Sequence, residues 1–296
     1  METYRRLLER HCQGQQVMGV EIGREKSLNV PVQRFTEAVQ GARLSRFERR
    51  AKHLVFRLSN GLCLLNHLML GGGLFYGTAA EAPERTYQVV LHLEGGRSLY
   101  WFGLRLGWLH LLDAAGLEQR LADLGVDPLD PAFTADHLRG LLRGRRKALK
   151  PLLVEQRFFP GIGNCYADEI CWTAGLHPLR PPGALTPAEA EQLWHAIGGT
   201  LGQAVALGGY TETPFHTGDR LTGGYLPHLK VYDRKGEPCP RCSGAIAYAE
   251  ETGRKVFWCP RCQPEEPAAV ATGMIPAPHP YHSNWERGEH PSFTEG

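Results

Sequence analysis

Cys239-Pro240-Arg241-Cys242 and Cys259-Pro260-Arg261-Cys262 are two Cys-x-x-Cys pairs near the end of the chain, separated by sixteen residues. Two residues between paired cysteines allow a tight turn that points both thiolates at one metal ion, and two such pairs complete a tetrahedron. The spacing therefore predicts one structural zinc ion bound by Cys239, Cys242, Cys259 and Cys262. Two disulfides are the alternative.

The segment between the two cysteine pairs has the pattern of a two-stranded ribbon. Residues 245–248 and 254–258 are strand-like and flank a turn at Glu251-Thr252-Gly253, which puts Arg254 and Lys255 near the tip. Zinc ribbons serve many functions, so the rest of the chain has to indicate which one applies. A ribosomal or transcription ribbon would account for residues 239–262 only.

The bulk composition is that of a soluble protein. The 296 residues suffice for two domains and a small appendage, and 42% are hydrophobic and 22% charged. No apolar run has the length of a membrane span, and the first thirty residues are too charged for a signal peptide. The other cysteines are scattered, which fits a reducing compartment better than a disulfide framework. We expect a cytosolic protein with no membrane partner.

The charge is unevenly distributed. The net charge is +2, but residues 264–296 carry five acidic residues and one basic residue, which leaves +6 on residues 1–263. The basic residues bunch at 43–57 and 143–150. This surplus is compatible with a polyanionic partner, although a solvated surface is the alternative. With six prolines and little periodicity, residues 264–296 are predicted to form a disordered tail.

The first part of the chain, residues 1–112, predicts a β-sandwich. Two pairs of strand-like segments flank tight-turn dipeptides: 54–58 and 62–65 around Asn60-Gly61, and 89–93 and 98–102 around Gly95-Gly96. A single helix over residues 4–11, capped by Thr3, precedes them. Several short strands with one leading helix are typical of a sandwich.

Residues 113–232 predict a helical domain. Helical patterns cover 114–124 and 134–142, and Thr186-Pro187-Ala188-Glu189 is a capping box that opens a long helix. The basic run at 143–150 either contacts an anion or is a solvated helix end. Residues 210–225, rich in Thr and Gly, predict a mobile loop.

A glycine turn, Gly161-Ile162-Gly163-Asn164, lies inside this domain and opens a further helix. Asn164 is the expected N-cap, and Gly175 the expected end. The free amides and the dipole at a helix N-terminus favour phosphate, but many helices begin this way, so the motif alone is weak.

In this order the parts resemble the formamidopyrimidine-DNA glycosylase/endonuclease VIII family of bacterial base-excision repair enzymes. The resemblance covers roughly residues 2–263 and includes Arg49-Arg50-Ala51-Lys52-His53, His67-Leu68 and Gly161-Ile162-Gly163-Asn164-Cys165-Tyr166. It implies an α+β chain with an N-terminal β-sandwich (1–112), a helix-two-turns-helix domain (113–232) and a zinc ribbon (233–263). It also implies a monomer that binds duplex DNA with a damaged base or abasic site in the bacterial nucleoid.

The resemblance implies a bifunctional DNA glycosylase and apurinic/apyrimidinic lyase that extrudes the damaged base, forms a Schiff base and cleaves the strand by β/δ-elimination. It gives Lys52 and Arg254 catalytic roles, with Asn164 in the phosphate clamp. Contacts with DNA are expected for these and for the following residues: His67, Leu70, Leu104, Arg105, Arg145, Lys150, Gly163 and Tyr166.

The beginning of the chain departs from the family pattern. Family members start with Pro-Glu-Leu-Pro-Glu-Val-Glu-Thr after the initiator, whereas this sequence starts Met1-Glu2-Thr3. We expect that translation starts six codons upstream of Met1 and adds the nucleophilic proline. If the chain begins at Met1, neither Met1 nor Lys52 is an evident replacement, and a catalytically silent lesion-binding protein is the alternative.

A second departure concerns the residues that fill the gap left by the extruded base. Where the formamidopyrimidine branch has a methionine turn and Asp-Pro-Arg-Arg-Phe-Gly, this chain has Met69-Leu70-Gly71-Gly72 and Phe102-Gly103-Leu104-Arg105-Leu106-Gly107. Leu70, Leu104 and Leu106 supply an apolar plug, but the arginine that pairs with the orphaned base is lost. Weak discrimination between opposite bases is expected.

Overall fold

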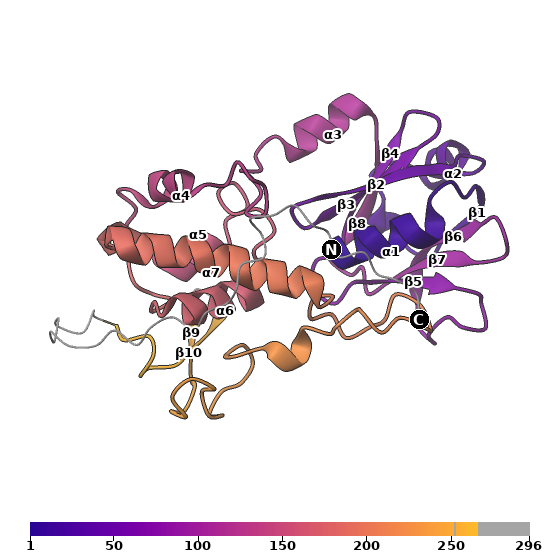
Figure 1. Cartoon of the computed structure of the whole chain (residues 1–296). Coiled ribbons are helices and arrows are strands. Elements are labelled where there is room, and N and C mark those ends of the chain that lie inside the picture. The colour runs from indigo at the N-terminus through magenta and orange to yellow at the C-terminus, as the bar shows by residue number, and fades with distance from the viewer. Residues whose placement is uncertain (252, 266–296) are drawn as a thin grey trace, which may run out of the picture. The chain divides into compact units, whose positions relative to one another are not determined.

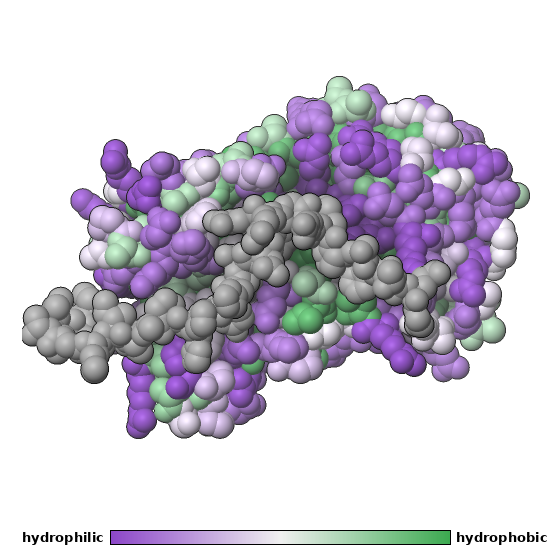
Figure 2. Space-filling view, viewed as in Figure 1, coloured by the Kyte–Doolittle hydropathy of each residue, from purple (hydrophilic) through white to green (hydrophobic). Residues whose placement is uncertain are grey.

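The structure is a computed structural model that describes residues 1–251 and 253–265. The predicted tail lies outside the described residues except for its first two positions. Among the described residues, no helix combines the length and the apolarity needed to cross a bilayer. Hydrophilic side chains cover most of the surface visible in Figure 2.

The N-terminal part is a sandwich of two antiparallel four-stranded sheets (Figure 1). One sheet has the order β1-β6-β7-β5 and the other β2-β3-β4-β8. Their bounds are β1 Val17–Ile22, β2 Leu44–Arg50, β3 His53–Leu58, β4 Cys63–His67, β5 Gly73–Gly77, β6 Tyr87–Leu93, β7 Ser98–Phe102 and β8 Trp108–Leu112. The predicted sandwich and both predicted hairpins, β3/β4 and β6/β7, are confirmed.

Three helices and a short 3-10 helix accompany these sheets: α1 Glu2–Cys12, α2 Val32–Val39, α3 Ala114–Leu121 and η1 Glu25–Ser27. Helix α1 begins earlier than predicted, and Thr3 does not cap it because the N-cap position falls at Met1. The expectation of a single leading helix is wrong, since α2 lies between β1 and β2. A helix of eight residues is not stable by itself in water, and α2 is held by Phe35 and Val39, which pack in the core of the sandwich.

Strand β3 is buried on both faces, which explains its nearly continuous apolar sequence. Leu54 and Phe56 belong to the core between the sheets, whereas Val55 packs with Leu117 and Leu121 of α3 on the outer face. A strand that is covered on both sides does not show polar alternation.

The helical part consists of α4 Ala135–Leu142, α5 Leu149–Leu153, α6 Asn164–Ala174 and α7 Pro187–Ala206, with 3-10 helices η2 Pro182–Ala184 and η3 Leu226–His228. The capping box is present, because the Thr186 hydroxyl accepts from the Glu189 amide and the Glu189 carboxylate accepts from the Thr186 amide. Helix α6 ends at Gly175 in the left-handed conformation, as predicted. The two-stranded ribbon follows as β9 Ala247–Glu251 and β10 Arg254–Trp258.

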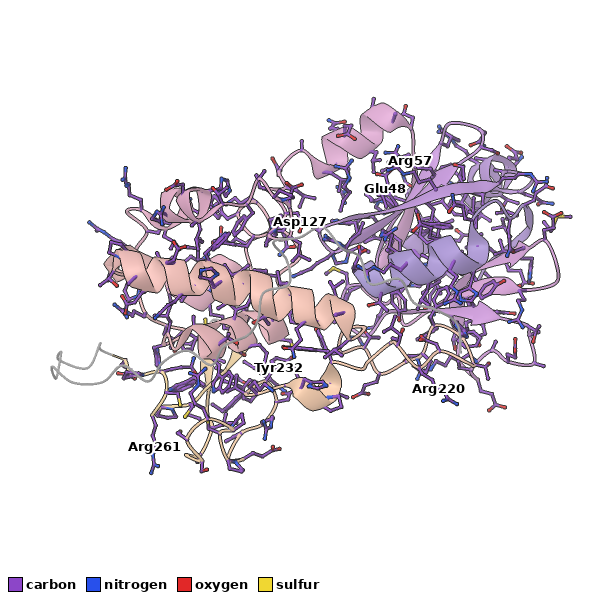
Figure 3. The ribbon with its side chains drawn as sticks, viewed as in Figure 1. Glu48, Arg57, Asp127, Arg220, Tyr232 and Arg261 are labelled. Atoms are coloured by element: carbon purple, nitrogen blue, oxygen red, sulfur yellow. The ribbon has the colours of Figure 1, made fainter. Side chains whose placement is uncertain are left out.

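An ion-paired arginine joins the sandwich to the connection between α3 and α4. Arg49 of β2 lies 3.2 Å from the Glu2 carboxylate and 2.7 Å from that of Asp127. Figure 3 shows Asp127 on this connection, between the sandwich strands and the helices. Burial of the guanidinium makes these charge-assisted contacts stronger than surface ion pairs.

The predicted loop at 210–225 is anchored by one aromatic side chain. Phe215 is completely buried in the core of the sandwich, with its ring centroid 5.9 Å from that of Tyr4. Its carbonyl accepts from the Tyr76 amide at 2.6 Å, and its amide donates to Asp219 at 2.8 Å. The segment is irregular, but it is held at this point by core packing and not only by its ends.

Phe215→Ala is expected to lower the free energy of unfolding of the sandwich by about 3–5 kcal/mol, because it leaves a cavity in a closed core. The measurement is urea unfolding followed by circular dichroism. Leu226→Ala, at a residue that is 39% exposed, is the control and should cost less than about 1 kcal/mol. Equal costs for the two variants would show that Phe215 does not anchor the segment.

Candidate nucleic-acid interface and zinc centre

The turn between β2 and β3 carries Lys52 and packs against the glycine turn before α6. Arg50 pairs with His53, and Ala51 between them has φ 55, a left-handed conformation that closes the turn. A Cβ placed on Gly163 would lie 3.4 Å from Lys52 Nζ. The Lys52 ammonium therefore faces the backbone at the start of α6.

The glycine turn leaves the N-terminus of α6 open. Gly161 has φ 94, which only glycine adopts without strain, and Gly163, not Asn164, occupies the N-cap position. No side chain in the described part of the chain caps this helix, so its first amides and the positive end of its dipole are available to an anion. The prediction of Asn164 as the N-cap is wrong; Asn164 is the first residue of the helix.

Arg254 lies at the tip of the ribbon, and its positive charge acts on Lys52. It begins β10, is paired with Glu251 across the turn, and is exposed. Its charge lowers the pKa of Lys52, after the larger effect of burial, and together they bring that pKa to about 8. The structure thus brings Lys52, the α6 N-terminus and Arg254 to one positively charged site.

A buried ion pair holds the ribbon next to α6. Lys150 Nζ of α5 lies 2.7 Å from an Asp168 carboxylate oxygen, with side chains that are 2% and 0% exposed. The same ammonium donates to the backbone carbonyl of Lys255 in β10. Burial raises the pKa of Asp168, and the Lys150 charge opposes this effect. Lys150 is therefore enclosed by protein, and its role here is to position the ribbon.

Glu169 is a positioning residue that the sequence did not single out. It is buried, and its carboxylate accepts hydrogen bonds from the amides of Lys230, Val231 and Tyr232 at 2.8–2.9 Å. These bonds fix the segment that leads into the ribbon. Two adjacent carboxylates, Asp168-Glu169, inside an otherwise apolar helix were the available signal, because buried charges need partners.

The loops that are expected to fill the gap in DNA pack against each other. Leu70 is 80% and Leu106 55% exposed, whereas Leu104 is completely buried in the core of the sandwich. A Cβ on Gly103 would meet the Gly71 carbonyl oxygen at 2.1 Å, so this contact requires glycine. The exposed apolar pair is therefore Leu70 and Leu106, and Leu104 supports the loop from inside.

His67 lies near Lys52 in a row of rings across the end of one sheet. Its ring centroid is 4.7 Å from that of His53 and 5.8 Å from that of Trp108. Burial, with smaller effects of His53 and Lys52, lowers its pKa to about 4. Its Nδ1 accepts from the Met69 amide at 3.0 Å, so Nε2 carries the proton of the neutral ring.

The remaining predicted residues, Arg145, Tyr166 and Arg105, make the following contacts within the protein. Arg145 stacks on the Phe158 ring at 3.9 Å and donates to the Leu141 carbonyl. The Tyr166 ring packs edge-on against Tyr210. The carbonyl of Arg105 accepts from an Arg24 guanidinium at 2.9 Å, which fixes its loop.

The four ribbon cysteines have the arrangement of a zinc site. All four sulfurs lie within 4.8 Å of one another. Cys239 and Cys262 are 3.9 Å apart and Cys242 and Cys259 3.4 Å apart, far longer than a disulfide and close to the edge of a ZnS4 tetrahedron. The disulfide alternative is wrong, and the four thiolates fit a structural zinc ion.

The side chains around the cysteines tie the zinc centre to α6. Trp172 Nε1 of α6 donates to Cys239 Sγ at 3.3 Å. Gln263 is completely buried, accepts from the Cys259 amide and donates to the Leu176 carbonyl just beyond α6. Figure 3 shows Arg261 at the outer end of the ribbon and Tyr232 closer to the helices.

An open helix N-terminus, two cations and a four-cysteine centre beside a sandwich fit the class of zinc-containing DNA repair glycosylases. Family comparisons match residues 1–107 to the formamidopyrimidine-DNA glycosylase N-terminal domain, 124–215 to its H2TH domain and 236–264 to the zinc finger found in FPG and IleRS. The chain belongs to the formamidopyrimidine-DNA glycosylase family.

Proteins with a similar sequence or fold align with this chain over most of their length. The formamidopyrimidine-DNA glycosylase of Pelotomaculum thermopropionicum is 36% identical over 89% of this chain and 97% of its own, and that of Chloroflexus aggregans 38% over 89% and 96%. A Lactococcus lactis Fpg bound to DNA with an abasic site has a TM-score of 0.83 and 27% identity over 89% of this chain and 97% of its own.

Replacing Cys239 by Ala is expected to abolish zinc binding, because three thiolates do not close the tetrahedron that folds the ribbon. Zinc content measured by mass spectrometry should fall from one ion per chain to below about 0.1. Affinity for abasic duplex should fall at least about 100-fold, since Arg254 loses its support. The sandwich should stay folded by circular dichroism.

Cys63→Ala is the matched control, because Cys63 is a buried cysteine of the sandwich outside the four-cysteine cluster. It should keep both zinc and affinity. If Cys239→Ala retained a full zinc ion, the assignment of the four ligands would be contradicted.

Proposed function

We propose that this protein excises oxidised bases from duplex DNA and cleaves the strand at the resulting abasic site through a Schiff base and β/δ-elimination. It acts as a monomer in the bacterial cytoplasm, on nucleoid DNA. The observation that carries the proposal is the convergence of Lys52, the open N-terminus of α6 and Arg254 on one site, because these three segments are far apart in the chain and each attracts an anion.

The geometry supports base extrusion more than simple binding along a duplex. Phosphates that flank an extruded nucleotide lie close together, and a helix N-terminus with an arginine opposite can hold both. Leu70 and Leu106 stand exposed on their loops and supply apolar surface for the gap in the stack. Lys52, beside the start of α6, is then near the sugar of the extruded nucleotide.

The family nucleophile, the amine of an N-terminal proline, stays a prediction for this protein. The experiment compares the chain as printed with one that carries Pro-Glu-Leu-Pro-Glu-Val in front of residue 2. Excision of an oxidised base by the extended chain supports the glycosylase. Tight binding to abasic duplex by both chains, with excision and borohydride trapping by neither, supports a silent lesion-binding protein instead.

Excision by the active form is expected to depend weakly on the base opposite the lesion. An apolar pair, Leu70 and Leu106, offers no hydrogen-bond donor to the orphaned base, so rates opposite the four bases should agree within about 10-fold, or about 1.4 kcal/mol. The measurement is single-turnover excision from four duplexes that differ only at this position. A preference for cytosine well above this range would contradict the assignment of the two leucines.

Binding to abasic duplex should weaken steeply with salt. Four to six phosphate contacts give a slope of roughly −4 to −5 in a plot of log K against log salt. Arg254→Ala should reduce the magnitude of this slope by about 1, because one phosphate contact is lost. Arg34→Ala, an exposed arginine on α2, is the control and should leave the slope unchanged. A flat response would contradict both the enzyme and the silent binder.

A further inference from the structure

Lys52 carries an amine that no part of the described chain neutralises. Among the described residues it makes no hydrogen bond and no ion pair, although its side chain is half-buried. The titratable groups around it are Arg254 from β10, His53 from β3 and His67 from β4, and none of them is a carboxylate. Surroundings without a carboxylate suit a lysine that meets phosphate, and they also leave its ammonium ion without a compensating charge.

These surroundings favour the neutral amine. Burial and the Arg254 charge bring the pKa of Lys52 to about 8. At pH 7 about one amine in ten is then unprotonated, compared with about one in three thousand for an ordinary lysine. The histidines cannot compensate the ammonium charge, and His67 is neutral at pH 7 because its pKa is lowered to about 4. Lysines that form imines with carbonyl substrates are activated by the same two effects.

The position of the amine fits this chemistry. The β2–β3 turn holds Lys52 Nζ over Gly163, where the absence of a side chain leaves the amine access to whatever binds at the start of α6. A nucleotide whose phosphate is bound by this helix N-terminus places its sugar within reach of the hairpin. The sequence indicated no replacement for the proline amine, because the surroundings of Lys52 come from residues distant in the chain.

We propose that Lys52 is itself an amine nucleophile that cleaves abasic-site DNA through a Schiff base of its own. The inference rests on the proposed binding of abasic DNA and goes beyond the accessory role expected for this lysine. It adds a strand-cleaving activity that does not require an N-terminal proline.

The reaction is balanced without any further reagent. The neutral Nζ attacks the aldehyde carbon C1′ of the ring-opened abasic sugar, water leaves, and a C1′=Nζ imine forms. Loss of the C2′ proton to water breaks the C3′–O3′ bond and releases the 3′ phosphate as the leaving group. Hydrolysis of the imine returns the unsaturated aldehyde on the cleaved strand and the free amine of Lys52.

The test is reductive trapping of the chain as printed with a duplex that contains one aldehydic abasic site. Cyanoborohydride converts the imine into a stable adduct, and peptide mapping locates it in the unaltered protein. We expect the adduct on Lys52. An adduct on the amine of Met1 would overturn the proposal.

The pH dependence separates the same two amines. Trapping by Lys52 should increase about tenfold per pH unit and level off near pH 8, because only the neutral amine attacks and its pKa is about 8. Burial lowers the pKa of the Met1 amine to about 6, so trapping by that group would already be level above pH 6. A plateau that begins at pH 6 therefore contradicts the assignment to Lys52.

A variant pair provides the second line of proof. Lys52→Arg keeps the charge but cannot form an imine, so trapping and strand cleavage of abasic duplex, both measured at saturating DNA, should fall at least about 50-fold. Lys26→Arg, at an exposed lysine of the sandwich, is the matched control and should behave as the unaltered chain. Full trapping by Lys52→Arg would refute the proposal.

The remaining outcomes distinguish this inference from the proposed function. Tight binding to a duplex that contains a tetrahydrofuran analogue of the abasic site, without any adduct, would overturn the role of Lys52 and leave lesion binding intact. Failure to bind either abasic duplex would overturn the proposed function, and the role of Lys52 with it.

Discussion

The buried ion pair between Lys150 and Asp168 is the interaction on which the geometry of the site depends. It joins α5 to α6, and the same ammonium binds the backbone of β10, so one charge holds the ribbon tip next to the open end of a helix. Loss of one partner from a buried pair leaves an uncompensated charge and costs about 3–5 kcal/mol. Arg254 is therefore placed by a contact between β10 and the interior of the protein.

The zinc centre and Glu169 hold the rest of the ribbon in place next to α6. The four thiolates close its base, Gln263 and Trp172 attach that base to α6, and Glu169 fixes the segment that enters it. A two-stranded hairpin of this size is not stable alone in water. Helix α6 thus supplies both the anion-binding N-terminus and the surface on which the second anion-binding group is built.

The site is positively charged because, among the described residues, no carboxylate pairs with Lys52. The Lys52 amine faces the backbone of the glycine turn, which carries no charge. Arg254 adds a like charge, and His67 is held neutral by burial. Such a site attracts phosphate strongly, and it also lowers the cost of removing a proton from the lysine. The proposed phosphate binding and the proposed amine reactivity therefore have one physical origin.

The sequence by itself determined the elements whose signals are local: the zinc ligands, the two hairpins, the capping box and the turn before α6. Spacing, turn dipeptides and caps act over a few residues, so they can be recognised without the fold. Only the tertiary structure decided that Lys150 and Leu104 are enclosed, that Glu169 holds a distant segment and that Lys52 has no negative partner among the described residues. Burial and pKa are set by neighbours from other parts of the chain, and no local pattern of residues specifies those neighbours.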